Sequence, residues 1–205
     1  PRILCDSIRG RAVAAIVLGC FASVAFTETP DIPWDRQRAL VWNDFQAPVP
    51  RTAASDRAAT SNTSIAWSYR YEIEWHNGEC RYRILEIDSR AAFHPDGSWV
   101  RPANRTAEIL DHEQKHFDIT RIFQQRFERF SRPFIGTTRA CNARNVRQAS
   151  RAVERDIVAV IGAEYEATWQ AHLEEQRSYD AETRHGIDRQ AQSQWAARIE
   201  DLVTD

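Results

Sequence analysis

The sequence predicts an α+β fold in which an N-terminal antiparallel sheet packs against three C-terminal helices. From Ile65 to Trp75, apolar side chains stand at every second position and polar ones alternate with them, which is the pattern of a half-buried strand. Asn77-Gly78 follows, and this dipeptide is a strong short signal for a β-hairpin. After Pro102 the apolar period changes to 3.6, which is typical of helices.

Composition limits the class of protein. The chain has 205 residues, of which 42% are hydrophobic and 27% charged, and this suits one globular domain with a core. The formal net charge is -2, and no basic cluster occurs in the sequence, so we expect no nucleic-acid partner.

Residues 1–25 have the pattern of a signal peptide. Arginines precede an apolar stretch at 12–22, and residues 23–25 offer the small side chains that signal peptidase requires. The stretch is too short to span a bilayer. We therefore expect a secreted or periplasmic protein with no stable membrane span in the mature chain. The alternative is a lipoprotein anchored through Cys20.

The elements follow in order along the mature chain. Residues 26–58, rich in Pro, Asp, Arg and Ala, predict an extended and irregular lead-in, and residues 59–205 form the domain, with strands within 59–100. The strand after the hairpin shifts its apolar phase between Ile84 and Leu85, which predicts a β-bulge. Only two cysteines remain after export, and we expect them to pair. They are Cys80 and Cys141.

Three helices are predicted at about residues 104–131, 143–176 and 188–203, each with apolar residues at helical spacing. The second is expected to face the core with a stripe of aliphatic residues, Val146, Val153, Ile157 and Val160. Glu164 continues that stripe where an apolar residue would be expected.

The first helix contains the run His112-Glu113-Gln114-Lys115-His116. Histidines at i and i+4 project from one side of a helix and can converge on one metal ion, and the adjacent glutamate can serve as general base. Both histidines continue the apolar stripe of this helix toward its N-terminus. The same placement also fits two core histidines with ordinary hydrogen bonds.

A catalytic zinc site takes three protein ligands, so a third is needed. His185 is the first choice, because it lies in the turn between the second and third helices and turns often carry function. Glu164 is the second choice. The remaining candidates are His172, His94 and Asp118, the last of which is better placed to support a ligand than to bind.

A resemblance to a known family adds to this interpretation. Residues 110–120 resemble the extended HEQxHFD motif of a bacterial family of predicted secreted zinc-dependent proteases, also described as a domain of unknown function. The run Tyr179-Asp180-x-x-Thr183-x-His185-Gly186 and the early Trp42-x-Asp44-Phe45 resemble the same family, so that the likeness covers about residues 40–203. It implies an exported single-domain zinc peptidase with a zincin-like active-site helix, whose motif histidines bind the metal and whose glutamate is the base.

The leading hypothesis is a zinc metallopeptidase acting on a peptide or protein substrate. Zn²⁺ would be held by His112, His116 and His185, with Glu113 as general base and Tyr179 as a donor to the oxyanion. A carboxylate would orient a ligand histidine, and the candidates are Asp111, Asp118 and Asp180. Two alternatives stay open: a non-peptidase zinc hydrolase of the cell envelope, and a non-catalytic envelope domain whose metal is structural or absent.

Overall fold

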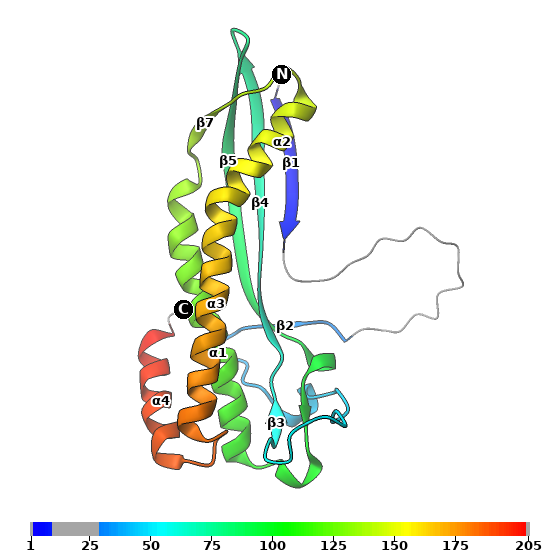
Figure 1. Ribbon diagram of the computed structural model, residues 1–205, viewed down its shortest axis with the longest axis vertical. Helices are drawn as coiled ribbons and strands as arrows, with labels where there is room; N and C mark the ends of the chain where they lie inside the picture. Colours follow the sequence, from blue (N-terminus) through cyan, green and yellow to red (C-terminus); the bar gives the residue numbers. More distant parts are fainter. Residues whose placement is uncertain (1, 10–28, 204–205) are drawn as a thin grey trace, which may run out of the picture.

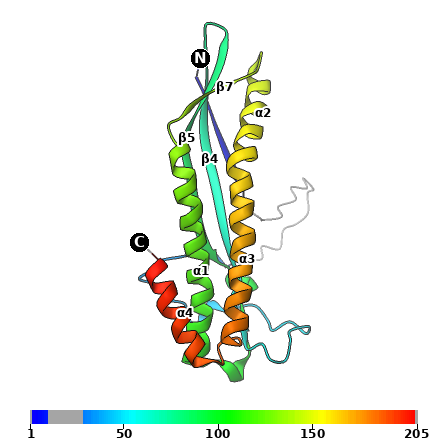
Figure 2. The same cartoon turned by 60° about the vertical axis from the view of Figure 1, so that its left-hand side comes forward.

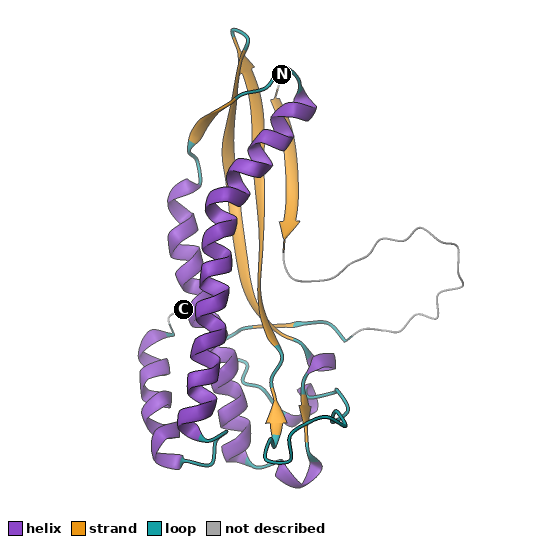
Figure 3. Cartoon of the chain, in the orientation of Figure 1, coloured by secondary structure: helices purple, strands orange, loops and turns teal. Residues whose placement is uncertain are grey.

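The computed structural model describes residues 2–9 and 29–203. The strands are β1 (Arg2–Arg9), β2 (Ile32–Pro33), β3 (Ala59–Thr60), β4 (Thr63–His76), β5 (Glu79–Phe93), β6 (Trp99–Val100) and β7 (Thr138–Cys141). The α-helices are α1 (Ala107–Ser131), α2 (Val146–Ile157), α3 (Ala163–Thr183) and α4 (Arg189–Leu202). Strands come first and helices follow, which confirms the predicted α+β class (Figure 3).

A long hairpin of β4 and β5 forms the centre of the main sheet (Figure 1). β1 pairs with β4, and β2 and β7 pair with β5, all antiparallel, while β3 and β6 make a separate two-stranded sheet. At the hairpin tip Asn77 and Gly78 have φ values of 51° and 83°, the two left-handed residues of a tight hairpin turn. The hairpin prediction is confirmed.

The predicted bulge lies in β5. Arg70 pairs with Glu86 and the next residue of β4, Tyr71, pairs with Ile84, so Leu85 is the extra residue. The bulge changes which positions face the helices. Ile84 is consequently 1% exposed, and Ile87 on the other side of the bulge is also buried.

Cys80 and Cys141 form a disulfide between β5 and β7, as the sequence predicts. The two residues lie opposite each other in the register of these strands, so the bond links two neighbouring strands of the sheet. A bridge of this kind persists in oxidising compartments. Closing a loop of about 60 residues contributes roughly 4 kcal/mol on the chain-entropy model.

The helices cover one face of the hairpin (Figures 1 and 2). α1 and α3 run side by side, and α4 packs beside them. The core contains aromatic residues from β4 and aliphatic and aromatic residues from α1 and α2. Its largest members with almost no exposure include Tyr71, Tyr82, Phe93, Phe117, Phe127, Ile157 and Ile161.

The second predicted helix is wrong in its length, and its predicted stripe is right at Val153 and Ile157, which are buried, but wrong at Val146 and Val160. It continues to Thr183 instead of ending at Gln176, and a π-helical turn, Val158–Gly162, joins α2 to α3. A π turn adds one residue to the helical period and so rotates the positions that follow. Ile161 is therefore the buried residue in place of Val160, and Val146, at the first turn, is 43% exposed.

The predicted signal segment is described only in part. Residues 2–9 form β1, residues 10–25 with Cys20 lie outside the described residues, and removal of 1–25 stays a prediction. The lead-in is largely irregular, as expected: its described residues, 29–58, contain only β2 and a 3-10 turn at Trp42–Asp44. Within the described part of the chain, no helix combines the length and hydrophobicity that crossing a bilayer requires.

Candidate metal centre

Helix α1 brings the two motif histidines together. Thr106 caps the helix by accepting a hydrogen bond from the backbone N–H of Ile109, so its first turn is fixed. His112 and His116 are one turn apart, and their Nε2 atoms lie 3.1 Å from each other. The two rings stand nearly perpendicular, at 89°, and His112 is 2% exposed. Both rings therefore aim the same nitrogen at one point.

A carboxylate from α3 completes the group. Oδ1 of Asp180 lies 3.2 Å from Nε2 of His112 and 3.1 Å from Nε2 of His116. These three residues, called the metal group below, could hold a metal ion, since their ligand atoms all lie within 4.8 Å of one another. Asp180 was expected only as a carboxylate that orients a histidine, so its place in the group is a finding of the structure.

Two glutamines fix the ring orientations of the histidines. Nδ1 of His112 lies 3.1 Å from Oε1 of Gln192, and Nδ1 of His116 hydrogen-bonds to Oε1 of Gln176. The amide nitrogens donate to the Asp111 carboxylate and to the His116 carbonyl, which fixes which end of each amide is the oxygen. Because an amide oxygen only accepts, both Nδ1 atoms carry a proton. Nε2 of each ring faces Asp180 and shares its proton with that carboxylate, and it would become a ligand atom when a metal displaces the proton.

The electrostatics of the group favour a positive centre. Burial alone would raise the pKa of Asp180, but hydrogen bonds from His112 and His116 outweigh it and lower that pKa well below its ordinary value. Burial alone would lower the pKa of His116, yet the hydrogen bond to Asp180 and the charge of Glu113 raise it. The carboxylates of Asp180 and Glu113 therefore stabilise positive charge on the histidines, and they would stabilise the charge of a bound metal ion in the same way.

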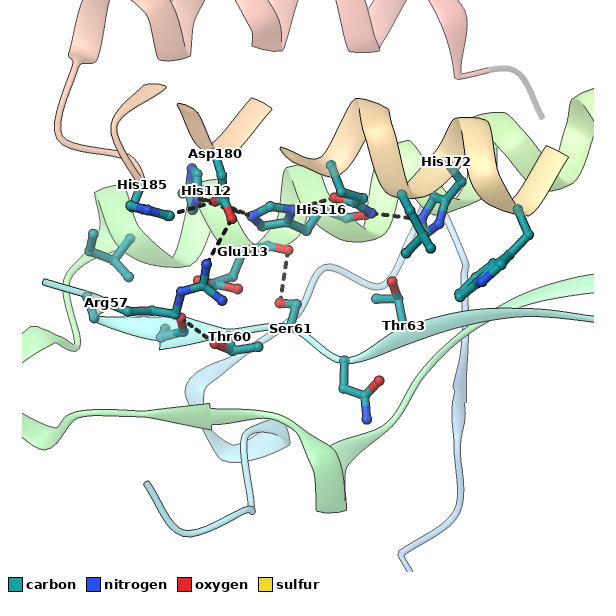
Figure 4. A pocket seen from close by; sticks show the side chains of 17 residues that line it. Arg57, Thr60, Ser61, Thr63, His112, Glu113, His116, His172, Asp180 and His185 are labelled. Carbon is teal, nitrogen blue, oxygen red and sulfur yellow. Dashed lines mark hydrogen bonds and ion pairs between the residues drawn. The ribbon is translucent and has the colours of Figure 1, made fainter. Parts of the chain in front are cut away.

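Glu113 lies in the wall of the same cavity (Figure 4). It is 3% exposed, and its Oε2 has no hydrogen-bond partner among the described residues. Its backbone carbonyl accepts a hydrogen bond of 3.2 Å from Ser61 Oγ, which ties α1 to the segment after β3. An unpaired buried carboxylate oxygen is costly, and this one lies beside His112 and His116.

His185 lies beside the group without belonging to it. Its Nδ1 is 3.1 Å from Oδ1 of Asp180, and its side chain is 32% exposed. The turn that carries it is unusual, since Arg184 and His185 have φ values of 50° and 54° and Gly186 follows at 84°. The structure thus brings the sequence's first choice of third ligand to the site, but places it against Asp180.

The other candidate ligands lie elsewhere. Glu164 is partly exposed and does not line the cavity, because it lies 16 residues before Asp180, about 24 Å away along the axis of α3. Asp118 is bonded to Trp34 Nε1 and Lys115 Nζ, and His94 is bonded to Asp31 and Ser64, so both serve packing of the lead-in. His172 lines the cavity, and its Nε2 is hydrogen-bonded to Thr120 and Gln176.

Tyr179 is fully buried behind His112. Its ring stacks on the imidazole, with centroids 4.6 Å apart, and burial raises the pKa of its hydroxyl. The hydroxyl donates to Gln192 Oε1 at 3.2 Å and does not line the cavity. This position holds His112 in place and does not suit the predicted oxyanion role, because substrate does not reach a hydroxyl enclosed on all sides.

The cavity has a volume of about 300 Å³ and lies between two walls (Figure 4). Helices α1 and α3 form one wall, and residues 57–63 form the other. Arg57 belongs to the second wall, and its Nη2 lies 3.4 Å from Oδ2 of Asp180.

Comparisons of the chain with protein-family models, with curated proteins and with solved structures found no match.

Proposed function

We propose that this protein is an exported zinc-dependent peptidase in which His112, His116 and Asp180 hold the metal and Glu113 is the general base. The observation that carries the proposal is the geometry of three ligand atoms spaced 3.1–3.2 Å apart, with both histidine Nδ1 atoms already committed to glutamine oxygens. In that arrangement Nε2 of His112, Nε2 of His116 and Oδ1 of Asp180 all point toward one position, where a metal ion could bind them together.

The donor set fits zinc. Tetrahedral zinc bound at about 2.0–2.1 Å places neighbouring ligand atoms about 3.3 Å apart, close to the spacing found here. Two imidazoles and one carboxylate leave a fourth position, which is the pattern of catalytic and not of structural zinc sites. Bound there, zinc would act as a Lewis acid and lower the pKa of a water at the fourth position toward 7.

Glu113 is placed to handle the proton. Its unpaired Oε2 would accept a proton from the attacking water and then deliver it to the leaving nitrogen. Helix α1 closes the site on one side, and Glu113 is only 3% exposed, so its carboxylate lies away from bulk water. A structural metal has no use for such a group, so Glu113 favours a catalytic function over a non-catalytic envelope domain.

Arg57 is the candidate for stabilising the developing negative charge. Its guanidinium is held beside the metal group by Asp180, while 41% of the side chain stays exposed. Its backbone carbonyl accepts a hydrogen bond from Arg101 Nε at 3.0 Å, which braces the loop. A fixed cation at this place would donate to the carbonyl oxygen of a substrate as that oxygen becomes an anion.

A peptide is the substrate that the walls suit best. The wall opposite the helices is built from β3 and the extended segment that leads into β4, and an extended wall accommodates an extended chain. The predicted signal peptide, the disulfide and the resemblance of residues 110–120 to exported zinc proteases support the same assignment.

The test compares wild-type protein with Glu113→Gln. We expect about one zinc per chain in both proteins, measured by atomic absorption, since Glu113 is not a ligand. Hydrolysis of a mixed peptide library should fall by about 100-fold or more in the variant, because general-base catalysis contributes roughly 10²–10⁴.

Glu128→Gln is the matched control, because it makes the same change on the same helix away from the cavity. It should keep both zinc and activity. Wild-type protein that binds no zinc would overturn the proposal, and so would a Glu113→Gln variant that retains full hydrolysis.

A further inference from the structure

The cavity extends beyond the metal group along α3 (Figure 4). Asp180, Gln176 and His172 follow one another at intervals of four residues and therefore lie on one face of the helix. Leu173, next to His172, and Trp169, about one turn beyond it, line the same cavity. The metal group thus occupies one end of the space, and a second set of side chains surrounds the other.

The far end of the cavity carries no fixed charge. The charged lining residues Arg57, Glu113 and Asp180 gather at the metal end, while His172 and Thr63 lie at the other (Figure 4). Nε2 of His172 accepts from the amide nitrogen of Gln176 at 2.8 Å, so it holds no proton. Burial, with the charge of His116, also lowers the pKa of His172 to about 4, so the imidazole is neutral near pH 7.

Aromatic rings pack together at this end of the cavity. The Trp169 indole stacks on the His172 ring, with centroids 4.9 Å apart and planes inclined by 29°. Phe123 meets the same imidazole edge to face at 5.7 Å. Nε1 of Trp169 is closed to solvent, so the accessible part of this indole is carbon. A charged group placed here would lose hydration and meet neutral polar groups such as the Thr63 hydroxyl, but no residue of opposite charge.

The far end lies within reach of a peptide bound at the metal group. Leu173 and Asp180 are seven residues apart on one helix, which is about 10 Å along its axis. An extended chain advances about 3.3 Å per residue. The far end therefore meets the side chain of a residue within about three positions of the bond at the metal group.

We propose that Trp169, His172 and Leu173 form a specificity subsite that selects a large apolar or aromatic substrate side chain and rejects charged ones. The inference rests on the proposed function, because it takes the metal group as the place of the scissile bond. It defines the substrate class as peptides with a residue such as Phe or Leu near the cleaved bond.

The test measures binding, which does not depend on turnover. The probes are tripeptide hydroxamates in which each position in turn carries Phe, Leu, Ala, Asp or Lys, titrated into the zinc-loaded protein by calorimetry. At one position Phe or Leu should bind at least about 10-fold more tightly than Asp or Lys. Leu173→Ala should reduce that preference, and Leu173→Lys should shift it toward Asp.

Leu202→Ala is the control, since this leucine is 41% exposed on α4 and does not line the cavity. It should leave the preference unchanged. Tight binding of every hydroxamate with no side-chain preference would overturn the subsite and leave the zinc site standing. The proposed function itself fails if the protein binds neither zinc nor any hydroxamate, and the subsite then fails with it.

Discussion

The candidate site is made by two rows of polar side chains on antiparallel helices. His112 and His116 on α1 face Asp180 and Gln176 on α3, and each contact is a hydrogen bond or an ion pair. Because every member is buried or half-buried, loss of one leaves a partner unsatisfied. The rows therefore hold each other in a single arrangement, which is the preorganisation a metal site requires.

We predict that Asp180, and not His185, is the third zinc ligand. In Asp180→Asn the carboxylate becomes a neutral amide, and zinc affinity, measured by competition with a chelator, should fall by more than about 100-fold. His185→Ala removes only a partner of that carboxylate, so a loss of about 10–100-fold is expected, as for other supporting contacts. If His185→Ala abolishes zinc binding while Asp180→Asn keeps it, His185 is the ligand and the assignment to Asp180 is wrong.

Part of this site could be predicted from residues alone. The spacing of His112 and His116 is informative without knowledge of the fold, because it places two ligands on one helix face. Asp180 could not be assigned, since the helix was expected to end at Gln176 and the π turn that sets its rotation leaves no clear signal in the sequence. If the helix had been expected to continue to Thr183, the four-residue spacing of His172, Gln176 and Asp180 would have predicted that these three side chains share one helix face.

Among the elements, the turn between α3 and α4 bears most directly on the metal group. It carries three successive residues with positive φ, ending at Gly186, and returns the chain so that Asp188 caps α4. A Cβ atom at Gly186 would lie 3.1 Å from Cβ and Cγ of His112. The turn therefore packs its backbone directly on His112, and a larger residue at this position would crowd that ring and strain the backbone.

Gly186→Ala tests this contact. The added methyl should push His112 from its position, so zinc affinity should fall by about 10-fold or more. Positive φ also costs about 1–2 kcal/mol for a non-glycine residue, which lowers the thermal midpoint.

Gly136→Ala provides the control, because Gly136 has a similar φ of 82° but a methyl group added there would meet no atom within 4 Å. It should lower the midpoint by a similar amount and leave zinc affinity unchanged. Equal zinc affinity in the two variants would show that the turn does not position His112.

Elements with strong local signals were predictable. The Asn77-Gly78 hairpin and the bulge at Leu85 depend on neighbouring residues, and both are confirmed. The first helix, expected from about residue 104, begins at Ala107 after its cap Thr106. The π turn has no such local signal: it lies between Ile157 and Ile161, which both pack in the core against residues of β4 and β5 that are distant in the sequence. That is why the inward face of the second helix was wrong from this point on.

Across the whole molecule, the metal group and the disulfide occupy opposite ends (Figure 1). The disulfide joins β5 and β7 near the hairpin tip, whereas the site lies where α1, α3, β3 and the turn before α4 meet. The lead-in reaches the site end through the ion pair of Arg57 with Asp180. The long sheet thus serves as the support on which the two site helices are aligned.

The assignment of the metal site is tested most directly by the anomalous scattering of a crystal of the zinc-loaded protein, recorded on both sides of the zinc absorption edge. We expect one strong peak between Nε2 of His112, Nε2 of His116 and Oδ1 of Asp180, at about 2.0–2.2 Å from each. A crystal that contains zinc but shows no peak at this position, or shows it at other residues, would mean that these three side chains do not hold the zinc.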